Sequence, residues 1–510
     1  MKRLAVSSAT VAAVLLLSGH AAAQAIQNVV LRNSFNQIGA GARGMGMGGA
    51  FIAVADDGTA ASFNPAGLAQ LRRTELAVVG FGDELRSTLE IPGFEGTETV
   101  SHSGRHEALD FIGLSVPFEV GGRNLTVQLS YQRSVDLFGR GSATVQENIP
   151  FSEIGLDRPG TVATIADISP DQSGAFHTGS MAAAYQVTER LSLGASVNYW
   201  VAEWLARGDA NFRLVLASAG QRPVEFYRVE KQFSQEQGFR AANVNLGLLL
   251  KYPRLSLGGV IRLPFTGDYE LTETAHERDF DLGQPAGVRD SATGLRSRLR
   301  WPRSLGVGVA LRPFSGLTLA ADYAKSYWSR AIIEDVPQGA LLTPRPPVDD
   351  EGNEQPAAYR NLNFFDLLPP AETAIADTDQ WRVGAEYLLT IPKVVLPFRA
   401  GLFRDRSPVV ELGTREGRKI EGFTLGTGLN FSRLALDVAF ERRRSEGRVG
   451  LRVTRGEGEP SSNAPTEEVE EDRFVGSIVY RFGGEDDPMK RLFHFLFVGP
   501  RDEPVQDDAG

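Results

Sequence analysis

Short segments in which apolar and polar residues alternate run through most of the chain, from about residue 74 to 482. In Leu125-Thr-Val-Gln-Leu-Ser-Tyr131 every second residue is apolar, and residues 191–199, 317–323 and 434–440 repeat the pattern. A period of two places successive side chains on opposite faces of a β-strand. We predict strands near residues 74–82, 106–118, 123–135, 173–187, 190–204, 236–253, 254–268, 295–312, 316–330, 378–390, 394–404, 421–431, 433–446 and 471–482. Soluble sandwiches alternate in the same way, so this pattern alone does not select a fold class.

The connections between these strands alternate between very short and long. The short ones lie around residues 121–122, 188–189, 253–254, 313–316, 391–393 and 432–433, and the long polar ones span 83–105, 136–172, 205–235, 269–294, 331–377, 405–420 and 447–470. Bacterial outer-membrane barrels have short periplasmic turns, longer extracellular loops and an even number of strands. The pattern therefore predicts an all-β fold: a transmembrane antiparallel β-barrel of about 14 strands over residues 74–482, with both ends in the periplasm.

The last predicted strand ends on aromatic residues. Phe474, Ile478, Tyr480 and Phe482 share one face, as lipid-facing side chains at a membrane interface do. Residues 483–510 follow, and they hold the apolar stretch 491–498 between acidic segments. We interpret them as a periplasmic tail that offers a contact to a periplasmic or secreted protein.

The first 25 residues have the organisation of a secretory signal peptide. Lys2 and Arg3 precede a mostly apolar stretch over residues 4–17, and small residues follow at 21–23. A membrane-spanning helix needs about 20 apolar residues, which is longer than this stretch. We expect cleavage near Ala23 or Ala25 and export to the cell outer membrane.

Composition narrows the class of protein further. The chain has 510 residues, 55 of them glycine, and the absence of cysteine excludes disulfides and thiolate sites. No later segment offers 18 consecutive apolar residues, which excludes a helical membrane protein. The net charge of −10 argues against nucleic acid as a partner. A mean hydropathy of −0.17 fits strands that face a polar lumen on one side.

Residues 26–73 form a segment of a different kind, rich in glycine and alanine. Small residues at this density let backbone pack closely against backbone. Alanine-rich stretches that end at Asn64-Pro65 favour short helices and turns. We predict an N-terminal helical or irregular plug that folds back inside the barrel. The alternative, a flexible periplasmic linker, fits poorly with the apolar residues Met45, Met47, Phe51, Ile52, Phe63 and Leu68.

Three motifs in this segment carry a family resemblance. The stretch Gly41-Ala-Arg-Gly-Met-Gly-Met-Gly-Gly-Ala-Phe51, then Ala55-Asp-Asp57, then Asn64-Pro-Ala66, resembles the plug of the FadL/TodX-type outer-membrane transport proteins. The match covers about residues 33–70. The resemblance implies a fourteen-stranded barrel filled by an N-terminal hatch, passive uptake of long-chain fatty acids or aromatic hydrocarbons, and sideways release at a kinked strand. The same motifs also resemble PorV-like barrels, which are scaffolds for protein secretion or surface attachment, and this remains the alternative.

The resemblance assigns roles to a few residues. Asn64, Pro65 and Ala66 become the hatch motif, and the strand near residues 123–135 becomes the candidate kinked strand, although no proline or bulge signature marks it. Candidates for hatch packing and substrate contact are Phe35, Met45, Met47, Phe51 and Phe63. Candidates for a substrate-capturing surface loop are Phe364, Phe365, Leu367 and Leu368, with packing against neighbouring loops as an equal alternative.

Nucleotide and metal sites have little support. Gly39-Ala-Gly-Ala-Arg-Gly44 fits the dinucleotide motif G-x-G-x-x-G, but it follows no predicted strand and opens no βαβ unit. His102 and His106 have the i, i+4 spacing of zinc ligands, but Gly104 interrupts the helix that would align them. Asp56-Asp57 has the ordinary position of acidic residues at a turn or a helix start. We expect neither a cofactor nor a metal.

An enzyme has equally little support. His177 and Ser180 lie three residues apart on one predicted strand, so they point to opposite faces. No G-x-S-x-G nucleophile elbow is present. We therefore expect a protein without catalytic residues, whose partners are hydrophobic small molecules and the lipid and lipopolysaccharide around it.

Overall fold

The computed structural model describes residues 35–36, 38–92, 97–140, 143–150, 160–218, 222–337, 359–365, 370, 375–410, 414, 416–448 and 466–483. The predicted signal peptide over 1–25 and the tail from residue 484 onward lie outside the described residues. The part that the structure describes consists mainly of β-strands, with a few short helices near its N-terminal end.

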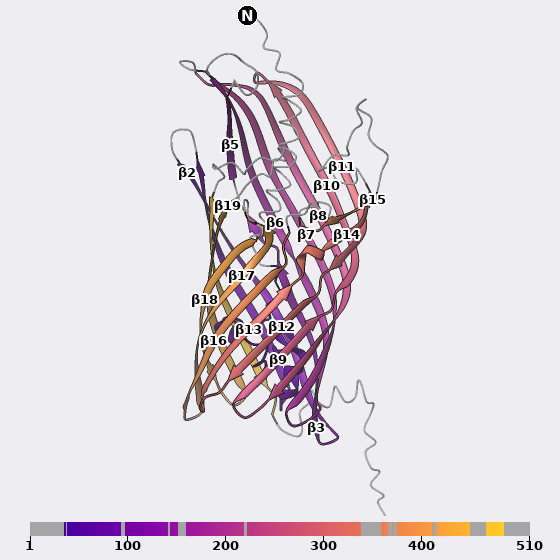
Figure 1. Cartoon of the computed structure of the whole chain (residues 1–510), viewed down its shortest axis with the longest axis vertical. Helices are drawn as coiled ribbons and strands as arrows, with labels where there is room; N and C mark the ends of the chain where they lie inside the picture. Colours follow the sequence, from indigo (N-terminus) through magenta and orange to yellow (C-terminus); the bar gives the residue numbers. More distant parts are fainter. Residues whose placement is uncertain are drawn as a thin grey trace, which may run out of the picture.

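Antiparallel strands wrap into one closed barrel (Figure 1). The strand segments are β1 (Glu75–Pro92), β2 (Thr97–Val120), β3 (Arg123–Asp136), β4 (Gly139–Arg140), β5 (Ala143–Pro150), β6 (Gly160–Gln186), β7 (Leu191–Ser218), β8 (Val224–Lys251), β9 (Leu255–Arg262), β10 (Phe265–Asp281), β11 (Gln284–Trp301), β12 (Ser304–Leu311), β13 (Leu317–Ser326), β14 (Ile332–Pro337), β15 (Tyr359–Asn363), β16 (Thr378–Ile391), β17 (Val394–Val410), β18 (Gly417–Asn430), β19 (Leu434–Arg448) and β20 (Thr466–Arg481). Several segments are pieces of one crossing, as β9 and β10 are, so the barrel has fourteen strands. The first strand pairs with the last, from Glu75 opposite Arg481 to Glu90 opposite Thr466, which leaves no open edge there. The predicted fourteen-stranded barrel is confirmed.

The outer wall carries the band that faces lipid. Large apolar side chains point outward and are more than half exposed, among them Val197, Tyr199, Leu402, Phe474 and Ile478. Backbone groups in such a wall all pair along the strands, which is what the interior of a bilayer requires. The alternation read from the sequence therefore reports a lipid-facing outer side and a lumen-facing inner side.

Strand length differs strongly around the barrel. A membrane crossing needs about 9–11 residues, whereas β7 and β8 have 28 each. In Figure 1 the strands β6, β7, β8, β10 and β11 continue past the ends of β16 to β19, away from the short turns. The prediction of loops over 136–172, 205–235 and 269–294 is therefore largely wrong. Backbone pairing continues beyond the lipid band. The outward side chains there face water and need not be apolar, so the alternation of apolar and polar residues weakens.

The pairing of the third strand, the candidate kinked strand, is irregular. Its register with β6 shifts between Arg133 and Val135, and β4 begins only after a break at residues 137–138. Its ladder with β2 ends where Phe111 lies opposite Gln132. Beyond that pair, β3 remains bonded to β6 as far as Asp136.

Residues 38–73 lie inside the barrel at its short-turn end, and we call them the N-terminal segment. They hold the helix α2 (Ala42–Gly46), the helix α3 (Ala60–Phe63) and the 3-10 helix η1 (Pro65–Gln70), and a further 3-10 helix, η3 (Trp328–Arg330), follows β13. Among the described residues, none of the helices combines the length and the apolar character needed to cross a membrane. The predicted short helices and turns are present.

Candidate functional site

Asn64 fixes the N-terminal segment to the barrel wall. Its backbone is extended, as expected before proline, and its side chain is fully buried. The Nδ2 group donates to the carbonyl of Ile52 and to the carbonyl of Leu248 on β8, both at 3.0 Å. The Oδ1 atom accepts from the Ala66 amide at 3.1 Å. The predicted hatch motif is thus both a local turn and a contact with the wall.

Glycines in the wall create recesses for this segment. A Cβ on Gly194 would lie 2.4 Å from the Ala66 amide nitrogen, and one on Gly247 would lie 2.2 Å from Asn64 Oδ1. On the opposite side, a Cβ on Gly384 would lie 2.1 Å from the Met47 carbonyl oxygen. Backbone therefore packs against backbone at several points around the ring, which leaves the segment little freedom to shift.

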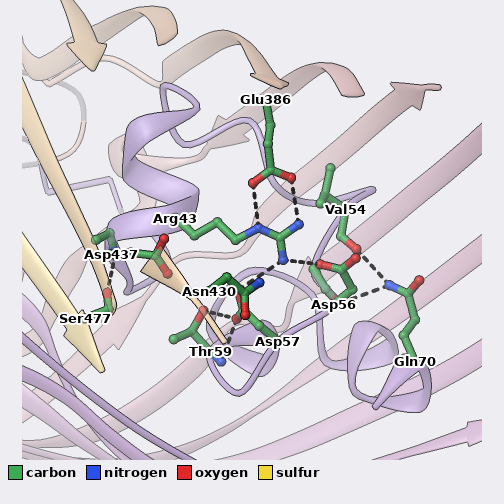
Figure 2. A network of polar contacts seen from close by, with 12 residues as sticks. Arg43, Val54, Asp56, Asp57, Thr59, Gln70, Glu386, Asn430, Asp437 and Ser477 are labelled. Atoms are coloured by element: carbon green, nitrogen blue, oxygen red, sulfur yellow. Dashed lines mark hydrogen bonds and ion pairs between the residues drawn. The ribbon is translucent and has the colours of Figure 1, made fainter. Parts of the chain in front are cut away.

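A network of charged side chains holds the other side of the segment (Figure 2). Arg43 donates from Nε and Nη2 to the two carboxylate oxygens of Glu386 on β16, at 2.9 Å each. Its Nη1 lies 2.6 Å from Asp56 and 3.5 Å from Asp57. Burial alone would lower the pKa of Arg43, but Asp56, Glu386 and Asp57 outweigh it and raise this pKa well above its ordinary value. Arg43 therefore stays charged.

The wall formed by β16 to β19 is rich in buried charge. Arg399 contacts Glu386 at 2.7 Å and Asp437 at 2.6 Å, and Arg382 donates to the Gly48 carbonyl at 2.9 Å. Removing one partner from such buried pairs costs more than the pair contributes, because an uncompensated charge remains. These contacts fix where the segment sits.

The lumen beyond the N-terminal segment is filled by aromatic rings, and we call them the aromatic cluster. Its members are buried and come from many elements: Phe35, Phe176, Trp200, Trp204, Phe239, Tyr269, Trp301, Trp328, Phe364 and Phe365. Ring centroids lie 4.9 Å apart for Phe35 and Phe365 and 5.2 Å apart for Trp301 and Trp328. One side of the lumen is thus aromatic and the other is charged.

The predicted contact residues divide into two groups. Phe51 and Phe63 pack edge to face with centroids 5.0 Å apart inside the N-terminal segment, and Met45 and Met47 are buried against the same segment and the wall. They are packing residues. Phe35 instead lies in the aromatic cluster, where Asn36 beside it accepts a hydrogen bond from Trp328 at 2.8 Å.

The predicted surface loop is placed differently by the structure. Phe364 and Phe365 are 9% and 4% exposed and pack inside the barrel against Phe35, so they do not form a surface patch. Leu367 and Leu368 lie outside the described residues. An apolar run in a long connection does not reveal whether the connection folds inward, and the contacts with β10 and β11 decided this.

The tryptophans of the cluster were not predicted from the sequence. Trp200 and Trp204 on β7 have the opposite parity to the lipid-facing Val197 and Tyr199, so they point into the lumen. Bulky aromatic residues on the inner face of predicted strands were the available signal. A water-filled porin lumen would be polar at these positions.

The cationic side chain of Arg262 borders the aromatic cluster. Arg262 at the end of β9 points inward and lines two narrow cavities of about 30 and 20 Å³, both of which also include Trp200. The first of these cavities continues to Phe111 and Gln132, where the β2–β3 ladder ends. Among the described residues, no carboxylate forms an ion pair with the Arg262 guanidinium.

Side chains bridge the seam between β2 and β3 beyond the last paired residues. His106 Nε2 on β2 lies 3.0 Å from Asp136 Oδ2 at the end of β3. The His106 ring stacks on Phe138, with centroids 4.6 Å apart and planes 12° apart. Arg133 also donates to Asp136, at 3.0 Å. Side-chain contacts therefore replace backbone hydrogen bonds along this part of the seam.

The chain folds as a closed, fourteen-stranded transmembrane β-barrel, and its fold is similar to that of FadL/TodX-type channels. A Pseudomonas aeruginosa FadL homologue superposes with a TM-score of 0.52 at 13% identity, over 88% of this chain and 100% of that chain. The P. putida toluene transporter TodX superposes with a TM-score of 0.53 at 16% identity, over the same shares. No family model and no curated protein matches the sequence. At these identities the likeness establishes the fold.

Proposed function

We propose that this protein is an outer-membrane channel of the FadL/TodX type for the passive uptake of hydrophobic molecules. The observation that carries the proposal is the aromatic cluster inside a closed barrel. Burial of apolar surface contributes about 25 cal/mol per Å², so such a lumen holds an apolar solute that a hydrated pore would reject. The toluene transporter TodX and the FadL homologue, which share the fold, support this class of substrate.

Arg262 favours a substrate with an anionic headgroup. A partly buried guanidinium without a carboxylate partner is favourably placed to bind a ligand that supplies the opposite charge. Its position beside Trp200 would bind a carboxylate while the apolar chain enters the aromatic cluster. A long-chain fatty acid has both the carboxylate and the apolar chain, whereas a plain aromatic hydrocarbon has only the apolar part. Because the bordering cavities are narrow, a substrate enters only when side chains shift.

We propose that the N-terminal segment is the plug and that substrate leaves sideways between β2 and β3. The segment is held by Asn64 on one side and by Arg43 on the other, which closes the direct route along the barrel axis. The cavity beside Arg262 leads instead towards Phe111 and Gln132. At that point the backbone ladder between the two strands stops. No energy-coupling step is involved, so net flux follows the concentration gradient.

Uptake by a deletion strain complemented with variants tests this function. We expect the wild-type gene to restore uptake of a labelled long-chain fatty acid. Arg262→Gln should reduce this uptake about tenfold or more, since a charge-assisted hydrogen bond contributes about 1.5–3 kcal/mol. Arg254→Gln, in an exposed turn, is the matched control. Unchanged uptake of fatty acids and aromatic hydrocarbons in the deletion strain would refute the channel, and full fatty-acid uptake by Arg262→Gln would refute the headgroup assignment alone.

The scaffold alternative makes a different prediction. A PorV-like barrel needs neither an aromatic lumen nor Arg262, and it should co-purify with secreted or surface proteins in fixed proportion. Purification of the barrel by itself, together with loss of uptake in the deletion strain, supports the channel.

A further inference from the structure

An open hollow of about 750 Å³ lies on the long strands. It lies over β6, β7, β8, β10 and β11, and we call it the outer hollow. Its lining combines apolar surface with polar side chains, among them Asp171, Arg207, Asp209, Gln232, His276 and Asp290. Nothing in the proposed transport route uses these side chains.

Strand register places the outer hollow on the outer wall. On β6 and β7, the lipid-facing pair Met181–Val197 and the hollow pair Asp171–Arg207 belong to one ladder without a register shift. On β7 and β8, the ladder from Val197–Val244 to Arg207–Ser234 is equally unbroken. Residues an even number apart share a face. The hollow therefore opens on the side of the sheet that lower down faces lipid, and the inward-facing Phe233 and Ala275 separate it from the lumen.

The height of the outer hollow follows from the strand geometry. Tyr199, 55% exposed on the outer wall, has the position of an aromatic residue at the membrane interface. Arg207 is eight residues further along β7, which is about 26 Å along the strand. Because strands tilt by about 40° relative to the barrel axis, this distance corresponds to about 20 Å along the axis. The headgroup layer is only about 5–8 Å deep on each side of a bilayer. The hollow therefore lies beyond it.

The polar side chains of the lining suit a branched sugar rich in hydroxyl groups. Carboxylates, hydroxyls and an amide bind sugar hydroxyls, and Arg207 and His276 offset two of the three carboxylates. Several of these side chains are already aligned across the strands: Gln232 donates to Asp209 at 3.1 Å, His276 Nδ1 lies 2.5 Å from Asp290, and Arg207 lies 3.7 Å from Asp171.

We propose that the outer hollow binds the core oligosaccharide of a neighbouring lipopolysaccharide molecule. The inference rests on the proposed outer-membrane location, where lipopolysaccharide borders the outer wall. The sugar layer of that lipid begins above the headgroups and extends outward to the height of Arg207 and His276. Binding there orders the lipid against β7 and β8 and keeps the long strands upright within the sugar layer.

The test compares two lipopolysaccharides on the purified full-length protein in detergent, by native mass spectrometry. One carries a complete core oligosaccharide, and the other carries only the innermost sugar acids on lipid A. We expect at least tenfold tighter binding of the complete core, since several hydrogen bonds of ordinary strength are at stake. The variant Arg207→Ala/Gln232→Ala/His276→Ala should lose this preference and keep its affinity for the truncated form.

Arg296→Ala is the matched control, because Arg296 is 87% exposed on β11 and does not line the hollow. Equal binding of the two lipids by the wild type, or a triple variant that retains the preference, would overturn the proposal. A triple variant that loses self-association instead would assign the hollow to a second copy of the chain. Uptake in cells should be the same for the triple variant and the wild type, so failure of this proposal is distinct from failure of the channel.

Discussion

Arg43 and Glu386 join the N-terminal segment to the barrel wall through two parallel hydrogen bonds of 2.9 Å. Such a bidentate pair fixes orientation as well as distance. The pair links residues 343 positions apart in sequence. It determines how far the segment can move in the lumen, and the first prediction follows from it.

Replacing Arg43 with Met should loosen the N-terminal segment without unfolding the barrel. Loss of one partner leaves Glu386 buried and costs about 3 kcal/mol, at the low end of the range for buried ion pairs. The strands keep their hydrogen bonds, so heat-modifiable gel mobility should stay normal. Proteolysis of residues 38–73 and passage of small polar solutes should rise. Arg105→Met, in an exposed pair 3.7 Å from Glu84, should do neither.

The double variant Asn64→Ala/Pro65→Ala should fold and transport poorly. It leaves the carbonyls of Ile52 and Leu248 without their Asn64 partner, at about 1–3 kcal/mol for each group. The 3-10 helix η1 also loses the proline at its first position. Uptake in cells is measured alongside gel mobility, with Pro253→Ala in an exposed turn as control. Full uptake by the folded variant would show that the motif is only a turn.

Adding a methyl group at Gly384 should displace the N-terminal segment. The new Cβ would lie 2.1 Å from the Met47 carbonyl oxygen, too close for backbone to accommodate. Gly384→Ala should therefore expose the segment to protease and reduce uptake. Gly476→Ala is the matched control, because a Cβ there meets nothing within 4 Å. Identical behaviour of the two variants would contradict the close packing of segment and wall.

Locking the seam between β2 and β3 should stop uptake reversibly. The chain has no cysteine, so a pair at His106 and Phe138 reacts alone with a reducible bifunctional thiol reagent. Crosslinking should block uptake, and reduction should restore it. Cysteines at Leu114 and Leu129, which already face each other in the ladder, provide the control. Unimpaired uptake by the crosslinked His106–Phe138 protein would place the exit elsewhere.

The sequence alone determined the type of barrel. Period-two alternation separated the two faces of each strand, and the six short turns fixed the strand count, because both signals are local. The extended backbone at Asn64 was also predictable, since Pro65 restricts the residue before it. Small residues marked the N-terminal segment as one that packs backbone against backbone.

Only the tertiary structure decided what meets inside the lumen. Alternation states that Trp200 and Arg262 point inward, but it does not state that they border one cavity. It likewise could not show that Phe364 turns inward to reach Phe35, or that Arg43 reaches Glu386. Such contacts depend on strand stagger, on the tilt of the barrel and on the path of the N-terminal segment. These are properties of the closed sheet as a whole, because each strand's height is set by pairing with both neighbours around the ring.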